Sequence, residues 1–238
     1  MKSIKIALIA AVACLSLPLS AQTADEIIST YIDNTGGQTW DDVKATKMSA
    51  TINQGGMSIP LTIYATDEGK QAVIIEFNGQ KITQMAFNGE TLWTTNFMSM
   101  KAEKASEEMT NNMKLNNNDF PSPLLHYKDN GYEVAYEGTE TKDGTETYKV
   151  KITSEPIMVN GVETPSISYY YFDVDTYVPI AVESTQMGQE VNMTMSDYQE
   201  VEGLYFPFAM SQAGQPFQLT EIQINPEIDD SIFEFPEE

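Results

Sequence analysis

The sequence contains no arginine: all 13 basic residues are lysine, against 35 aspartate and glutamate residues. The resulting formal net charge of -22 argues against nucleic acid as a partner, because phosphate backbones are bound by dense Lys and Arg surfaces. Polyanionic ligands are disfavoured for the same reason. The chain also holds a single histidine, His126, and a single cysteine, Cys14.

These scarcities leave few residues suited to catalysis. A serine or cysteine nucleophile needs a general base, and His126 lies in an apolar stretch where packing or surface exposure explains it. The acid pairs Asp173 with Asp175 and Asp229 with Asp230 lack a recognisable calcium-loop spacing, and no Cys/His cluster suits zinc. We predict no catalytic residue, no metal ligand and no cofactor. A two-carboxylate hydrolase stays open only because acids are abundant.

The first 21 residues have the pattern of an export signal. Lys2 and Lys5 form the charged start, an apolar run covers residues 6–19, and Ala21 ends a small-residue cleavage site. The run is too short to anchor the chain across a bilayer. We predict a soluble periplasmic protein that begins at Gln22, with a charge of -24 because cleavage removes two lysines and no acids.

A competing interpretation makes Cys14 the site of lipid attachment. The mature chain would then begin with the apolar residues 15–19, where a polar tether is expected. We therefore favour the soluble form over a membrane-anchored lipoprotein. The soluble form has no cysteine and no disulfide, so its own core must hold it together, which is feasible at this length.

Three segments favour helix. Thr23 and Glu26 have capping-box spacing before an apolar stripe, and Gly36-Gly37 ends that helix. Residues 98–118 combine helix-favouring residues with a run of three asparagines at 116–118, and they predict a helical insertion with a hinge. Ser122-Pro123 provides the cap and first position of a short further helix.

The rest of the chain has the alternation of β-strands. Residues 57–64 alternate apolar and other side chains, and Asn78-Gly79 and Asn88-Gly89 mark two consecutive hairpins. Strand and turn signals resume at Tyr132 and run nearly to the end. We predict a single domain over 22–238, mainly β, with roughly ten to eleven antiparallel strands. Such a sheet must curl, so we expect a half-open barrel with an N-terminal helix and a helical lid.

Strand parity predicts which side chains line the apolar interior of this barrel. Glu76 shares its face with Ile74 and marks that face as outward. The predicted cavity residues are Met57, Ile59, Leu61, Ile63, Val73, Ile75, Phe77, Met85, Phe87 and Trp93, with Val191, Met193 and Met195 opposite them.

Methionine is prominent in the predicted insertion. Its unbranched, polarizable side chain suits irregular or mobile apolar partners, although it also fills gaps in ordinary cores. We predict that residues 97–113 form a mobile gate whose closed state rests on apolar packing over the cavity mouth; a fixed plug is the alternative. The predicted lid residues are Phe97, Met98, Met100, Met109 and Met113.

The order of motifs along the chain resembles the outer-membrane lipoprotein-sorting proteins, the LolA/LolB-like family. Each motif is weak alone, and their order over residues 24–236 carries the resemblance. The motifs lie at residues 24–28 with 31–32 and 36–37, 57–61, 87–89 with 93, 122–124, 170–173 with 176–180, 196–198 with 203–207, and 225–233.

This resemblance implies a half-open antiparallel barrel capped by helices, whose apolar cavity holds lipoprotein or lipid acyl chains. It implies a non-enzymatic, monomeric periplasmic carrier, with an inner-membrane donor and an outer-membrane acceptor as partners. The family's carriers tether the lid helix with an arginine, which this sequence lacks. Lysine cannot copy the planar guanidinium fork, so the lid must be held differently.

Two other functions stay open at this stage. One is an envelope sensor or interaction module on the same fold, which binds lipid or lipoprotein and signals to a partner protein. A cavity closed by polar side chains would favour it. The other is a hydrolase, which a buried carboxylate pair with raised pKa values would favour.

Overall fold

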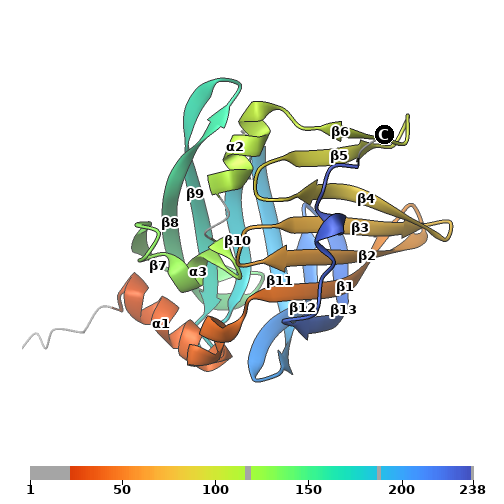
Figure 1. The fold of residues 1–238 in the computed structure, drawn as a ribbon. Helices are drawn as coiled ribbons and strands as arrows, with labels where there is room; N and C mark the ends of the chain where they lie inside the picture. Colours follow the sequence, from red (N-terminus) through yellow and green to blue (C-terminus); the bar gives the residue numbers. More distant parts are fainter. Residues whose placement is uncertain (1–21, 116–118, 187–188, 237–238) are drawn as a thin grey trace, which may run out of the picture.

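The computed structural model describes residues 22–115, 119–186 and 189–236. The predicted signal peptide, Cys14 and the predicted hinge at 116–118 lie outside the described residues. Within the described part, the architecture is mainly β, as predicted, with short α-helices on the concave side of a single sheet (Figure 1).

Thirteen antiparallel strands form this sheet in the described residues, two more than the upper end of the predicted range. Their spatial order is β6-β5-β4-β3-β2-β1-β13-β12-β11-β10-β9-β8-β7, so two long meanders join where β1 pairs with β13. The strands are β1 (Ala45–Gln54), β2 (Met57–Thr66), β3 (Gln71–Phe77), β4 (Gln80–Phe87), β5 (Leu92–Asn96), β6 (Lys101–Lys104), β7 (Glu133–Lys142), β8 (Thr145–Val159), β9 (Val162–Asp173), β10 (Pro179–Gln186), β11 (Gln189–Val201), β12 (Leu204–Gln212) and β13 (Gln215–Ile224).

The sheet curls without closing. The edge strands β6 and β7 do not pair with each other, and the curl brings them to opposite sides of an open mouth (Figure 1). The predicted half-open antiparallel barrel is therefore confirmed.

Two of the predicted helices cover the concave side of the sheet. Helix α1 (Ala24–Thr35) begins with the predicted capping box of Thr23 and Glu26 and is followed by the 3-10 helix η1 (Gly37–Asp42). Helix α3 (Pro123–His126) has Ser122 as its cap and Pro123 at its first position, as predicted. Apolar side chains of α1 and α3 pack with Val150, Ile152 and Phe172 of the sheet. Together, α1 and α3 fill the concave side of the barrel at the end where α1 lies.

A second cluster fills the concave side between the two meanders. Trp40 of η1 packs there with Phe206, their ring centroids 5.1 Å apart, and Leu61, Leu204 and Leu219 join them from the sheet. Buried aromatic rings contribute large apolar areas to such a core.

The predicted helical insertion is only half helix. Lys101–Lys104 forms β6, which pairs with β5, and helix α2 covers only Glu107–Leu115. Residues 97–100 make the tight β5–β6 turn, in which Met100 adopts a φ of 56°. The Lys-Ala-Glu-Lys stretch has good helix propensity, but hydrogen bonding to the neighbouring strand overrides it.

The convex face of the first meander is covered by the end of the chain. Residues 226–235, here called the C-terminal strap, run across β2 to β5 and include the 3-10 helix η3 (Asp230–Ile232) (Figure 1). Phe233 is completely buried against Ala72, Ala86 and Trp93, and the Trp93 Nε1 donates a 3.0 Å hydrogen bond to the Phe233 carbonyl.

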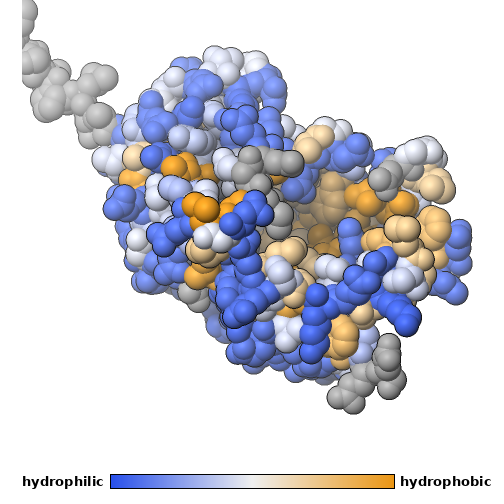
Figure 2. All heavy atoms as spheres, turned by 90° about the horizontal axis from the view of Figure 1, so that it is seen from above, coloured by the Kyte–Doolittle hydropathy of each residue, from blue (hydrophilic) through white to orange (hydrophobic). Residues whose placement is uncertain are grey.

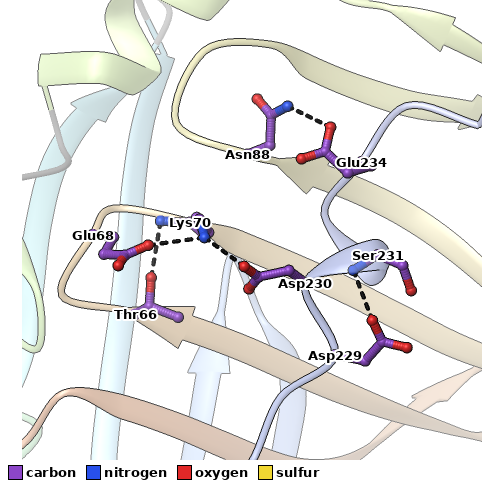
Figure 3. Close-up of polar contacts among 8 residues, drawn as sticks. All are labelled: Thr66, Glu68, Lys70, Asn88, Asp229, Asp230, Ser231 and Glu234. Carbon is purple, nitrogen blue, oxygen red and sulfur yellow. Dashed lines mark hydrogen bonds and ion pairs between the residues drawn. The ribbon is translucent and has the colours of Figure 1, made fainter.

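Polar contacts join this strap to the sheet at two points, Asp230 and Glu234 (Figure 3). The Lys70 ammonium lies between the carboxylates of Glu68 and Asp230, at 2.8 and 2.9 Å. Further along, the Asn88 side-chain amide donates a 2.8 Å hydrogen bond to Glu234. Because the Glu68 and Asp230 carboxylates are largely exposed, their ion pairs with Lys70 contribute little, and we attribute the hold mainly to the buried Phe233.

Candidate ligand cavity

The concave side contains two adjoining chambers of different polarity. The first, here called the apolar chamber, has a volume of about 380 Å³. Figure 2 views the molecule from above and shows hydrophobic residues gathered in a hollow, with hydrophilic surface around it. The apolar chamber is lined by Tyr31, Trp40, Met48, Pro121, Ser122, Leu124, Ser168, Tyr170, Pro179, Val182, Ser184, Val191, Met193, Met195, Tyr198, Tyr205, Phe206, Pro207, Met210 and Leu219.

Strand parity explains how this lining arises. Along β11, Val191, Met193 and Met195 are alternate residues and therefore project from one face of the sheet. Tyr198 is anchored by donating a 2.6 Å hydrogen bond to the Pro179 carbonyl. Burial raises the pKa of Tyr31 to about 12, so its hydroxyl stays uncharged in the physiological range. The apolar chamber therefore combines methionine and valine walls with an uncharged Tyr31 hydroxyl.

The second chamber, here called the polar chamber, has a volume of about 500 Å³. It shares Pro121, Ser168, Tyr170 and Ser184 with the apolar chamber, so the two meet at these residues. It is lined by Ala65, Gln71, Asp119, Phe120, Pro121, Pro123, Tyr132, Ile152, Ser154, Ile157, Ser166, Ser168, Tyr170, Ser184 and Thr185. The cavity as a whole is amphipathic.

Asp119 is the one carboxylate among the described residues that line the polar chamber. The Tyr132 hydroxyl donates a 2.8 Å hydrogen bond to its Oδ1. Burial raises the pKa of Asp119, and this effect outweighs the hydrogen bonds from Tyr132 and Asn130, which lower it. The fold therefore disfavours the charged form of this side chain.

We expect Asp119→Asn to stabilise the protein at neutral pH. Because the folded pKa is raised, an unfolded chain releases the Asp119 proton first, and stability falls as pH rises from the ordinary value of 3.8 toward the folded value. The substitution removes this loss. Chemical denaturation at pH 7 should show the variant to be more stable, and the difference should vanish below about pH 3.8. An equal effect at both pH values would contradict the assignment.

Helix α2 bridges the open mouth of the barrel through polar contacts. The Glu108 carboxylate accepts hydrogen bonds from the Asn160 and Gly161 amides at 2.9 and 2.7 Å, at the tip of the β8–β9 hairpin. The Asn112 side chain binds both the amide and the carbonyl of Met158. These four hydrogen bonds are here called the α2 latch. They hold α2 against the tip of the β8–β9 hairpin.

The same helix also contacts the opposite side of the mouth. Lys114 forms a 2.5 Å ion pair with Glu90, in the turn between β4 and β5. No residue of α2 is buried, so the helix adds little to the core. An exposed ion pair of this kind contributes about 0–1 kcal/mol.

We expect Asn112→Ala combined with Glu108→Ala to release the hairpin tip while leaving global stability nearly unchanged. The amides of Met158, Asn160 and Gly161 lose their acceptors, so their hydrogen exchange should accelerate by at least tenfold. Glu107→Ala, which removes the exposed neighbouring carboxylate, is the matched control. Unchanged exchange at the tip in the double variant would contradict the latch.

The predicted lid residues lie in two separate places. Met109 and Met113 lie on α2, whereas Phe97, Met98 and Met100 lie in the β5–β6 turn and are exposed, Met98 by 98%. A closed state resting on Met98 and Met100 packed over the mouth is therefore wrong. The reason is that residues 101–104 form strand β6 and pair with β5. The turn that joins these two strands therefore lies at the end of the sheet away from α2 (Figure 1).

The predicted cavity residues divide into four groups. Val191, Met193 and Met195 line the apolar chamber. Leu61, Ile63, Val73 and Ile75 pack into the concave cluster around Trp40, and Ile59, Met85 and Phe87 are buried or half-buried on the same sheet face by register. Met57 and Phe77 are exposed at strand ends, so their assignment to the lining is wrong. Trp93 packs under the C-terminal strap on the convex face, so its assignment is also wrong.

Most of the lining residues were not predicted from the sequence. Met48, Val182, Met210 and Leu219 come from four different strands, and only the pairing of β1 with β13 brings these regions together. A sequence signal existed for β12, where Phe206, Phe208 and Met210 alternate with other residues. The polar chamber had no such signal because its hydroxyls come from separate strands.

Other features of the described residues bear on function. No three His, Cys, Asp or Glu residues among them are placed to hold a metal ion. Within the same residues, no helix has both the length and the apolar character needed to cross a membrane.

Comparison with known proteins gives a likeness of structure only. No family model and no curated protein matches the sequence. The structure is similar to a DUF1329 family protein from Desulfovibrio piger, with a TM-score of 0.55, 14% identity, and 88% of this chain and 96% of that chain covered. It is also similar to a LolA superfamily protein from Nitrosomonas europaea, with a TM-score of 0.54, 13% identity, and 90% and 98% covered. The protein therefore has a LolA-like fold.

Proposed function

We propose that the protein is a non-enzymatic periplasmic carrier that shields acyl chains of lipids or lipoproteins in the apolar chamber and delivers them toward the outer membrane. The observation that carries this proposal is the chamber itself, with Met193, Met195 and Met210 among its walls. Methionine-lined surfaces adapt to partners of varied shape. The LolA-like fold agrees with such a role.

The size of the chamber suits a single chain. A methylene group occupies roughly the 30 Å³ share of a water molecule, so about 380 Å³ accommodates about a dozen methylenes. Burial at about 0.8 kcal/mol per methylene gives a gross gain of roughly 10 kcal/mol. Binding therefore needs no charge pair, and release depends on a competing acceptor.

Mass spectrometry of the protein purified from the periplasm tests this function. The carrier proposal expects co-purified lipids or acylated peptides at close to stoichiometric amounts. It also expects a fluorescent fatty acid to bind in competition with them. Protein that is free of lipid and does not bind the fluorescent probe would contradict the proposal.

The envelope-sensor alternative is favoured by one observation. The lid α2 is closed by polar contacts, the α2 latch, and such contacts suit an interaction module. A sensor would bind a partner protein only when lipid is bound, whereas a carrier transfers lipid to acceptor vesicles. For the hydrolase alternative, the described lining of the polar chamber supplies the single carboxylate Asp119 and no partner acid.

A carrier must also approach membranes, and we propose that the hairpin tips at one end of the sheet make this contact. The β1–β2, β3–β4 and β5–β6 turns lie at the same end (Figure 1). They expose Met57, Phe77, Phe97, Met98 and Met100.

Phe97→Ser with Met98→Ser should weaken association with phospholipid vesicles by at least fivefold in a sedimentation assay. The physical reason is the loss of exposed apolar surface that would enter the lipid interface. Val162→Ser, at an exposed apolar position beside the β8–β9 turn, should have no effect. Equal losses in both variants would contradict a docking role for the β5–β6 turn.

A further inference from the structure

The polar chamber contains a row of hydroxyl groups on one face of the sheet. Ser154 of β8 is paired with Ser166 of β9, and the Ser154 hydroxyl donates a 2.8 Å hydrogen bond to the Ser166 hydroxyl. Ser168 of β9 is paired with Ser184 of β10. Since Ser166 and Ser168 are alternate residues, their side chains share a face. All four serines line the polar chamber.

This row begins where the apolar chamber ends. Ser168 and Ser184 line both chambers, and so does Tyr170, the next residue on the same face of β9. Along the concave side, the lining therefore changes from methionine and valine side chains to serine hydroxyls. A ligand that satisfies both chambers has an apolar tail and a head able to exchange hydrogen bonds with hydroxyls.

The charges in the polar chamber further restrict the chemistry of the ligand's head group. Among the described residues that line it there is no lysine, and its one ionisable carboxyl group is Asp119. An anionic head would lose its water without gaining a cation, and it would face the Asp119 carboxylate. Hydroxyl groups, in contrast, both donate to a carboxylate and exchange hydrogen bonds with serine.

We propose that the cavity binds a single-chain amphiphile with an uncharged, hydroxyl-bearing head, such as a monoacylglycerol, with the head in the polar chamber and the chain in the apolar chamber. The inference rests on the proposed carrier function and specifies its ligand class. Ser166, Ser168 and Ser184 bind the head, and Asp119 accepts a hydrogen bond from a head hydroxyl and disfavours anions.

Three probes with the same twelve-carbon chain test this assignment: monolauroylglycerol, laurate and dodecylamine. Each displaces a bound fluorescent fatty acid from the purified full-length protein at pH 8. We expect monolauroylglycerol to bind at least tenfold more tightly than laurate. It should also bind more tightly than dodecylamine, because an ammonium loses its water on entering the chamber and a single carboxylate does not offset that cost. Ser166→Ala with Ser184→Ala should weaken monolauroylglycerol binding by about tenfold and leave laurate nearly unchanged, because the lost hydrogen bonds are to the head.

Two further variants sharpen the test. Asp119→Asn should improve laurate binding at least threefold, since it removes the repelling carboxylate. Ser196→Ala, which alters an exposed serine on β11 outside both linings, is the matched control and should change nothing.

The outcomes separate this inference from the carrier function. Equal binding of all three probes, or a preference for laurate or dodecylamine, would overturn the head assignment while leaving a chain-binding carrier intact. An unchanged preference in the double serine variant would also overturn it. Failure of every probe to bind would contradict the carrier function itself.

Discussion

Met193→Glu should weaken acyl-chain binding about 10- to 100-fold. Met193 projects from β11 into the apolar chamber, so the new carboxylate would lie against the bound chain. Leaving a neutral polar group without partners in an apolar site costs about 1–3 kcal/mol, or about 5- to 150-fold in affinity, and an unpaired carboxylate costs at least as much. Titration of a fluorescent fatty acid measures the loss directly.

The matched control is the neighbouring residue on the same strand. Asn192→Glu adds the same charge, but the Asn192 side chain is exposed and lies outside both chambers. It should leave affinity unchanged within about a factor of two. Equal losses in the two variants would show that charge acts from a distance and that Met193 is not in contact with the ligand.

Phe233→Ala should produce the largest loss of stability among the variants considered, about 3–5 kcal/mol of unfolding free energy. The Phe233 ring is fully buried against Ala72, Ala86 and Trp93, and its removal leaves a hole beneath the C-terminal strap. Ala72 and Ala86 are too short to fill that space, and Trp93 is held in place by its hydrogen bond to the Phe233 carbonyl. Urea denaturation followed by circular dichroism measures the difference.

Phe77→Ala makes the same chemical change at a site that is 40% exposed, at the end of β3. We expect it to cost about 1 kcal/mol or less, because little packing is lost. If Phe233→Ala cost no more than Phe77→Ala, the strap would not be part of the core. Ligand binding should be retained in the folded Phe233→Ala protein, since the strap lies on the convex face.

The architecture could be predicted from the sequence because the caps, turns and strand patterns along the chain all indicate the same fold. The capping box at Thr23, the cap at Ser122 and the Asn78-Gly79 turn all lie where the pattern placed them. Their conformations depend on nearby backbone groups alone. The parity of Val191, Met193 and Met195 was also readable, because β11 alternates without a break there.

Trp93 shows how a register error reverses a prediction. The turn after Asn88-Gly89 pairs Phe87 with Leu92 and Ala86 with Trp93. Trp93 therefore shares the convex face with Ala86, whereas strand parity predicted the concave face that Phe87 shares. Because the side-chain period of a strand is two, a one-residue error moves a side chain to the opposite face.

The two chambers could not be predicted from local sequence patterns. Their walls join β1 and β13, which are more than 150 residues apart in sequence by their paired positions Thr46 and Ile224, and no motif records that pairing. The α2 latch was equally hidden, since Asn112 and Glu108 meet the β8–β9 tip only in the folded chain. The exposed turn at Met98 looked helical because its flanking residues favour helix in isolation.

The two tryptophans allow the most direct test of the central claim, that the acyl chain lies on the concave side. Trp40 lines the apolar chamber, whereas Trp93 is buried under the C-terminal strap on the convex face. Single-tryptophan variants, Trp93→Phe and Trp40→Phe, each report one face by fluorescence. A monoacylglycerol with bromine atoms on its chain should quench Trp40 strongly and saturably and leave Trp93 unquenched. Quenching of Trp93 without quenching of Trp40 would contradict a chain bound in the apolar chamber.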